Sequence, residues 1–296
     1  MALELNPGDG RADNDPSMMI VSIPPSLWEP VRFSWSIAEI FEVRLLEIRG
    51  KSCGSIHGKL AIVSGGGVVR IFDRPNVNCA PKISSKELIP IEGPFRAISG
   101  LGDVGLRIRL KEGEKEIIRD IIFFDQLRDK KNAVVTKRSL GSGASLEMKL
   151  AVYQRAVVAN VEIRLVSSKN GKGHSGLYGK ITTSNSLLPR METLLFCKKR
   201  EDHVNLAGCD LIPLCRSITA VPAKKRLKIH AHLYDVSGGY LVIGDVIYVI
   251  PEYLCDDIKY INGKHGQRIE VKVTWEEFWP HVRRKGAYSS LNGKSR

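Results

Sequence analysis

The chain has 296 residues, 43% of them hydrophobic and 26% charged, and its 45 Lys and Arg against 32 Asp and Glu give a formal net charge of +13. This composition is ordinary for a soluble globular protein, and the length allows two hydrophobic cores. No run approaches the roughly 18 apolar residues that a membrane-spanning helix requires, so we predict no transmembrane segment.

The first 30 residues are predicted to form a disordered acidic segment, because they are polar and carry Glu4, Asp9, Asp13 and Asp15. They lack the basic and apolar regions of a secretory signal. We therefore expect a cytoplasmic or nuclear protein. The basic tail at 278–296 could bind a polyanion or act as a nuclear-import signal.

The stretch that begins at Glu42 is repeated about 120 residues further along the chain. A period of this size corresponds to a domain or a large half-domain rather than to a solenoid repeat. We predict a first β repeat over 31–154 and a second over 155–277. The matching pairs of segments are 55–60 with 176–181, 87–91 with 210–214, 120–124 with 245–249, and 146–150 with 269–273.

Strict alternation of apolar and polar residues dominates the sequence. It is clearest in 104–110, 227–233 and 269–275, and a period of two places every second side chain on one face of a sheet. The stretch 35–46 is also predicted to be a strand. Gly-rich and Asn-Gly turns between the strands are typical of hairpins. The sequence therefore predicts an all-β fold of two antiparallel β-sandwich-like halves.

Two short apolar runs, 121–124 and 246–250, show no alternation and are expected to be strands buried on both faces. The connection at 154–160 contains no Gly, Pro or Ser, so it is expected to continue as strand. We predict that the two halves pack closely, without a flexible linker.

Two motifs resemble ligand sites but have simpler explanations. Residues 100–105 match G-x-G-x-x-G, yet a strand rather than a helix is predicted after them, which favours a hairpin turn over a dinucleotide site. His230 and His232 have a spacing that can chelate a metal, but the sequence identifies no third ligand. We predict no metal site and no cofactor.

The best candidate for a functional surface is one basic strand face in each half. Such faces attract polyanions such as RNA or anionic lipid. Tyr234 is the only aromatic neighbour, which weakens an interpretation as a single-stranded RNA site, because unpaired bases stack on rings. The simpler alternative is a solvated, functionless surface. The candidate residues are Lys224, Lys225, Arg226, Lys228, His230 and His232 in the second half, and Arg107, Arg109 and Lys111 in the first.

No catalytic motif is present: the sequence has no Gly-x-Ser-x-Gly, His-Glu-x-x-His or Walker loop. The recurrent Glu42/Arg44 and Glu162/Arg164 pairs place opposite charges on one strand face, which indicates ion pairing rather than acid–base chemistry. We predict no catalytic residues.

The cysteines form no C-x-x-C pair, and their positions differ between the two repeats. Together with the missing secretory signal, this predicts reduced thiols and no disulfide. The six are Cys53, Cys79, Cys197, Cys209, Cys215 and Cys255.

The order of 54–59, 71–74, the Gly-Pro-x-Arg-Ala stretch at 93–97 and the closing 271–275 resembles an uncharacterised plant domain that is abundant in grasses. The resemblance covers about 33–275. Some members carry names of jasmonate-induced or ribosome-inactivating proteins, which would imply an rRNA N-glycosidase. The helix-borne Glu-Ala-x-Arg signature of those toxins is absent here.

We interpret the chain as an intracellular, non-enzymatic plant interaction module with an unidentified protein partner. A stress or defence role is implied only by the resemblance. The alternative function is polyanion binding, to RNA or acidic lipid, through the basic strand faces. An rRNA N-glycosidase is the disfavoured third hypothesis, because it would need a base pocket with an acid and aromatic walls.

Overall fold

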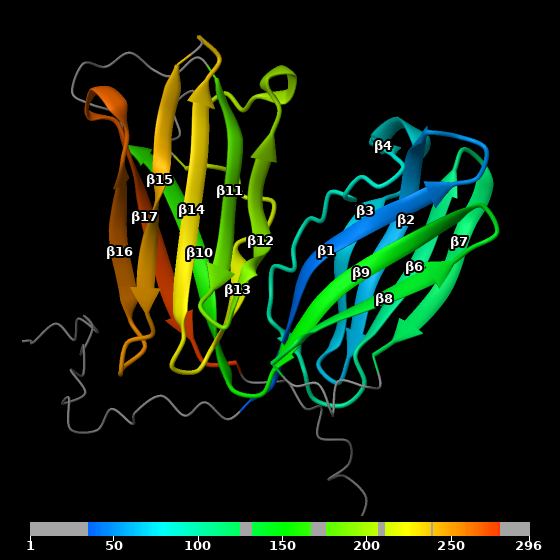
Figure 1. Cartoon of the computed structure of the whole chain (residues 1–296), viewed down its shortest axis with the longest axis horizontal. Helices are drawn as coiled ribbons and strands as arrows, with labels where there is room; N and C mark the ends of the chain where they lie inside the picture. The colour runs from blue at the N-terminus through cyan, green and yellow to red at the C-terminus, as the bar shows by residue number, and fades with distance from the viewer. Residues whose placement is uncertain (1–34, 125–131, 167–175, 207–210, 238, 279–296) are drawn as a thin grey trace, which may run out of the picture.

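The computed structural model describes residues 35–124, 132–166, 176–206, 211–237 and 239–278 (Figure 1). The predicted acidic N-terminal segment, nearly all of the basic tail and Cys209 lie outside these residues. In the described ranges the regular secondary structure is almost entirely β-strand, which confirms the predicted all-β, antiparallel fold class. Its helical structure there is limited to three short 3-10 turns, too short to cross a bilayer.

The first half is a pair of sheets that enclose one hydrophobic core, in which Leu45, Leu60 and Leu146 are fully buried. One sheet has the strand order β5-β1-β9-β8 and the other β3-β2-β6-β7, with β4 attached to β2. The strands are β1 (Ile37–Ile48), β2 (Cys53–Ser64), β3 (Gly67–Arg74), β4 (Lys82–Ser84), β5 (Ile98–Ser99), β6 (Gly105–Glu112), β7 (Lys115–Phe123), β8 (Val134–Leu140) and β9 (Ala144–Tyr153), with the turn η2 (Val77–Cys79).

The second half repeats this arrangement around its own core, which includes Ile163, Leu233 and Tyr248. Its sheets have the orders β13-β10-β17-β16 and β12-β11-β14-β15. The elements are β10 (Ala156–Val166), β11 (Leu177–Asn185), β12 (Leu188–Lys198), η4 (Arg200–Asp202), β13 (Ile218–Pro222), β14 (Arg226–Asp235), β15 (Tyr240–Val249), β16 (Asp256–Asn262), η5 (Lys264–Gly266) and β17 (Arg268–Glu276).

The two halves share the same strand order, and each sheet draws its strands from one half only (Figure 1). Two glycines occupy matching places in this pattern. Gly58 on β2 and Gly179 on β11 both adopt a positive φ, of +122° and +126°. A Cβ at either position would lie 2.1 Å from the carbonyl oxygen of Arg109 or His232 across the sheet. Arg109 and His232 are therefore structurally equivalent.

The expectation that 121–124 and 246–250 are buried on both faces is wrong. These segments belong to β7 and β15, the last strands of their sheets, which pack on the core through one face only. Ile121 and Phe123 remain 44% and 52% exposed, and Ile247 and Val249 are 47% and 60% exposed. Burial alternates along these strands although polarity does not.

One connection differs from the sequence-based expectation, and another largely agrees with it. Residues 100–105 do not form a hairpin turn, because β5 pairs with β1 whereas β6 pairs with β2 and β7, so the glycine-rich stretch carries the chain from one sheet to the other. The connection 154–160 is strand from Ala156 onward. Only Gln154 and Arg155 separate β9 from β10.

The matched glycines give a stability test. We expect Gly58→Ala and Gly179→Ala each to lower the free energy of unfolding by about 2 kcal/mol or more, because the new Cβ meets backbone at a strained φ. Gly239 has open space around it and serves as the control. Chemical denaturation of the three variants would measure this, and equal stabilities for all three would contradict the proposed geometry.

Candidate functional site

The predicted basic face of the first half lies on the outer surface of sheet β3-β2-β6-β7. Lys59 on β2 lies opposite Arg109 on β6, and Arg109 lies opposite Arg119 on β7, so three cations form one row across the sheet. Arg107 and Lys111 flank Arg109 along β6 on the same face. We define the cationic face as Lys59, Arg70, Arg107, Arg109, Lys111 and Arg119.

Two carboxylates, Asp73 and Glu116, also lie on the cationic face, and each of them lies close to two cations. Asp120 is turned toward β8, where its carboxylate accepts a hydrogen bond from Ser139. The face therefore keeps a net positive charge. The contacts are Asp73 with Arg70 (3.2 Å) and Lys59 (3.8 Å), and Glu116 with Arg109 (3.3 Å) and Arg119 (3.9 Å).

One end of the cationic face is apolar. Ile121 lies opposite Arg107, and Phe123 lies opposite Gly105, with its ring close to the position that a Gly105 Cβ would take. Val68, at the start of β3, is exposed at the same end of the sheet. The same sheet surface therefore carries cations over most of its length and exposed apolar side chains at one end.

The equivalent face of the second half has a different character. Lys228, a predicted site residue, forms an ion pair with Asp245 at 2.6 Å, and Lys180 forms one with Glu192 at 2.8 Å. Arg226 lies on β14 itself. Lys224 and Lys225 lie in the turn before that strand. Among the predicted residues, Lys228 is therefore neutralised by a carboxylate.

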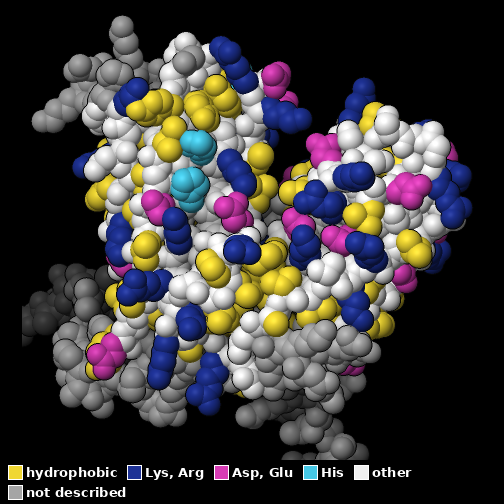
Figure 2. All heavy atoms as spheres, in the orientation of Figure 1, with side chains coloured by type: hydrophobic (Ala, Val, Ile, Leu, Met, Phe, Trp, Pro, Cys, Tyr) yellow, Lys and Arg dark blue, Asp and Glu magenta, His cyan; other side chains and the backbone are white. Residues whose placement is uncertain are grey.

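Aromatic rings occupy the remainder of this second face. Tyr178 stacks on Tyr234 with ring centroids 5.3 Å apart, and His232 lies 5.6 Å from Tyr234. His230 is 5.9 Å from His232. Figure 2 shows the two imidazoles in line, with apolar side chains beyond one end and charged side chains beyond the other. Within the described residues, no three His, Cys, Asp or Glu side chains are grouped to hold a metal ion.

The two predicted faces do not form one surface. In Figure 1 the strands β11, β12, β14 and β15 lie in front of β10 and β17, whereas in the other half β1, β8 and β9 lie in front of β2 and β6. The aromatic face of the second half therefore points to the viewer, and the cationic face points away. One rigid polyanion could not cover both.

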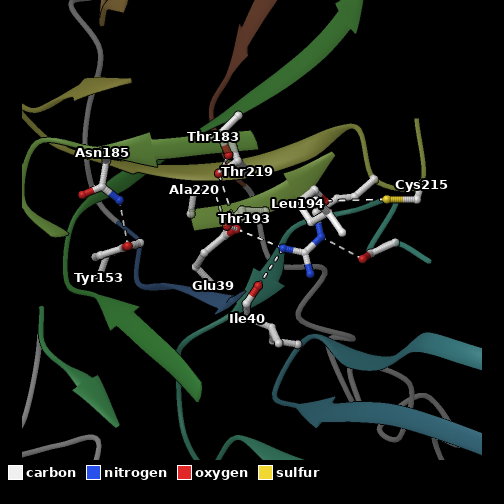
Figure 3. Close-up of polar contacts among 12 residues, drawn as sticks. Glu39, Ile40, Tyr153, Thr183, Asn185, Thr193, Leu194, Cys215, Thr219 and Ala220 are labelled. Carbon is white, nitrogen blue, oxygen red and sulfur yellow. Dashed lines mark hydrogen bonds and ion pairs between the residues drawn. The ribbon is translucent and has the colours of Figure 1, made fainter. Parts of the chain in front are cut away.

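The halves are joined by a buried ion pair that the sequence did not reveal. The Glu39 carboxylate on β1 accepts hydrogen bonds from Thr193 Oγ1 (2.7 Å), the Ala220 backbone N–H (2.8 Å) and Thr219 Oγ1 (3.4 Å), all from the second half (Figure 3). Arg216 Nη1 lies 3.2 Å from it. All five residues are almost entirely buried.

Arg216 also binds the backbone of the first half. Its Nε donates to the Gly93 carbonyl at 2.8 Å and its Nη1 to the Ile40 carbonyl at 2.6 Å. Burial raises the pKa of the Glu39 carboxyl above its ordinary value, while Arg216 and the hydrogen-bond donors act in the opposite direction. Burial lowers the pKa of Arg216, and Glu39 opposes that shift.

An apolar cluster surrounds this polar contact. Ile37, Phe41 and Tyr153 of the first half pack with Val158 and other residues of the second. The Tyr153 hydroxyl accepts a hydrogen bond from Asn185 Nδ2 at 2.8 Å (Figure 3). Packing and hydrogen bonds together therefore hold the halves in contact.

A cleft of about 630 Å³ lies beside this interface. One wall is β1 together with the segment 86–91 that runs along it, and the other is the end of β12 with η4. Figure 2 shows the notch between the two halves. Sequence periodicity could not identify this cleft, because it requires the relative placement of two halves that the sequence describes separately.

Other sequence-based expectations can be placed in the structure. Arg44 lies 3.2 Å from Glu42, and Arg164 lies 2.8 Å from Glu162, so both recurrent pairs are ion pairs. Glu42 also pairs across strands with Lys149 at 2.7 Å. The five cysteines in the described ranges are free thiols.

Comparison with known families gives one match: "Domain of unknown function (DUF6598)", over residues 37–273. The search of curated proteins finds no match. Among solved structures, the calcium-bound C2A and C2B domains of Extended-Synaptotagmin 2 are similar at 9% identity over 85% of this chain and 99% of that one, with a TM-score of 0.27. Human GIVD cytosolic phospholipase A2 is similar at 10% identity, over 83% of this chain and 30% of that one, with a TM-score of 0.25.

The buried ion pair gives the second prediction. Arg216→Met should destabilise the protein by about 3–5 kcal/mol, because Glu39 stays buried without its charge partner. Adding Glu39→Leu should recover part of that loss, since no unpaired charge then remains. A double-mutant cycle measured by denaturant unfolding tests this. If the stability losses of the two single variants simply added in the double variant, the prediction would be contradicted. The control is Lys180→Met, at an exposed ion pair, which should lower the free energy of unfolding by less than about 1 kcal/mol.

Proposed function

We propose that this chain, which belongs to the DUF6598 family, is a binding module that attaches to anionic membrane surfaces through the cationic face of its first half. The observation that carries the proposal is the row Lys59, Arg109 and Arg119, flanked by Arg107 and Lys111 on one sheet surface. Cations near an anionic leaflet contribute roughly 1 kcal/mol each.

The apolar end of the cationic face favours a lipid surface over RNA. Ile121, Phe123 and Val68 can enter the boundary between headgroups and acyl chains while the adjacent cations bind the headgroups. RNA recognition needs several rings to stack bases, and Phe123 is the one exposed ring among the outward residues described for this face. RNA is therefore the second candidate function.

The finer features of the function are proposals of the same kind. We propose that the repeats, over 31–154 and 155–277, are the two units of the module, and that it acts in the cytoplasm or nucleus, where accessible leaflets are anionic and thiols stay reduced. A plant origin and a stress or defence role rest on the resemblance alone. A protein partner could use the aromatic face, which carries Tyr178, Tyr234 and the two histidines.

The predicted residues of the second half have a smaller role in this proposal. Lys228 has its own carboxylate partner, Asp245, whereas Asp73 and Glu116 on the cationic face each lie between two cations. Lys224 and Lys225 lie in the turn before β14. They add to the long-range positive field, which speeds association without fixing orientation.

The test is a matched pair of triple variants. Arg107→Gln, Arg109→Gln and Arg119→Gln together should weaken binding to phosphatidylserine vesicles about a hundredfold at low salt, because three headgroup contacts are lost. The control, Lys180→Gln with Arg226→Gln and Lys228→Gln, removes the same charge from the other face and should retain most of the binding. Vesicle co-sedimentation over a salt series measures both.

Equal losses in the two variants would contradict the proposal, because net charge alone would then explain binding. If the protein ignored vesicles but bound labelled RNA, with a log–log salt slope of roughly −0.7 per phosphate contact, RNA would replace lipid as the ligand.

A further inference from the structure

We propose that the cleft between the halves is a binding site for a single amphiphilic anion, a molecule with a long apolar body and one acidic head group. This site is separate from the cationic face. The cleft lies beside β1, in the sheet opposite the one that carries the cationic face. Its volume of about 630 Å³ falls in the range typical of small-molecule sites.

Part of the cleft wall is apolar. Phe41, Val43 and Ile89 line it from the first half and belong to the buried packing of that half or of the interface. Leu194 lines it from β12, and Leu88 is exposed at its edge. Such walls exclude water from an acyl chain or fused ring system, and burial of its apolar surface is the main driving force for binding.

A buried cation with a free donor also lines the cleft. Arg216 is 2% exposed and uses Nε and Nη1 for Gly93, Glu39 and Ile40. Its Nη2 has no hydrogen-bond partner within the part of the chain that the structure describes. Because Arg216 borders the cleft, this N–H group is available to an acidic oxygen of a ligand.

Charge around the cleft also fits an anion. Lys86 of the first half and Lys199 of the second line it, and neither forms an ion pair with a described residue. Glu42, Glu87 and Asp202 lie there too and offset part of the charge. The lysines that line the cleft, Lys82, Lys86, Lys198 and Lys199, still outnumber these three carboxylates. An acidic head group would therefore be attracted to the cleft.

The halves hold the cleft in a fixed shape. Arg216, which belongs to the second half, is bonded to Glu39, Ile40 and Gly93 of the first half, and the Gly93 backbone N–H donates to the Cys215 carbonyl at 2.7 Å. A preorganised cleft binds its ligand without the cost of closing two mobile units.

Cys197 supplies an internal reporter. This exposed thiol lines the cleft, whereas Cys255 is exposed elsewhere in the second half. We expect palmitate, below its critical micelle concentration, to slow alkylation of Cys197 by iodoacetamide about tenfold or more at saturation and to leave Cys255 unchanged, because an occupied cleft blocks access. Peptide mapping by mass spectrometry reads both thiols in one sample.

The ligand series tests the head group and its source. If any acidic head group suffices, lysophosphatidic acid should protect Cys197 from alkylation as well as palmitate does. Stronger protection by one of the two would show whether the cleft prefers a lipid phosphate or a free carboxylate. Hexadecanol and inorganic phosphate should each fail, since one lacks the charge and the other lacks the apolar body. Equal protection by hexadecanol, or none by palmitate and lysophosphatidic acid, would overturn the proposal.

Matched variants locate the effect. Lys86→Gln with Lys199→Gln should raise the Kd for palmitate about tenfold, the expected effect of losing a charge-assisted contact. Lys224→Gln with Lys225→Gln removes the same charge away from the cleft and should bind as the parent does. Leu88→Asp, at an exposed edge position, should also weaken binding. If both lysine pairs had the same effect, the cleft would not be the site.

Discussion

The structure depends on one buried charge pair that crosses the interface. Glu39 lies on the central strand of a sheet in the first half, yet its hydrogen-bond partners come from β12, β13 and the segment before β13. A carboxylate without water must find partners inside the protein, so this one residue fixes how the second half can sit. The apolar cluster around Phe41 and Tyr153 supplies attraction, but apolar contacts are non-directional. The ion pair fixes the relative orientation of the two halves, and the cleft lies beside the interface that this orientation creates.

A common backbone allows the two halves to differ in surface chemistry. The strand orders match, and so do the positive-φ glycines Gly58 and Gly179, because inward side chains and close backbone contacts leave little freedom. Outward positions are less constrained. Arg109 in the first half and His232 in the second occupy equivalent places, yet one belongs to a row of cations and the other to a ladder of rings. Sites on a fold can therefore change while the core stays the same.

The sequence predicted what local pattern determines. Alternation located β6, β14 and β17, because a half-buried strand requires a period of two. The same rule failed for Ile121 and Val249, since composition cannot distinguish a strand buried on both faces from an edge strand with exposed apolar side chains. The outward direction of Arg107 and Lys228 was also predictable. The ion pair of Lys228 was not, because Asp245 becomes its partner only through the strand register.

The edge strand β7 exposes apolar side chains beside cations, and this combination affects which partners its surface can contact. An edge strand with Ile121 and Phe123 outward would invite association with another sheet, a hazard that proteins limit with nearby charge. On β7, Arg119 and the neighbouring cations of β6 supply that charge, so pairing with a second cationic copy is disfavoured whereas contact with an anionic surface is not. A membrane bound there would lie against sheet β3-β2-β6-β7. The opposite sheet, with β1 and the cleft beside it, would stay open to solvent and to a second ligand.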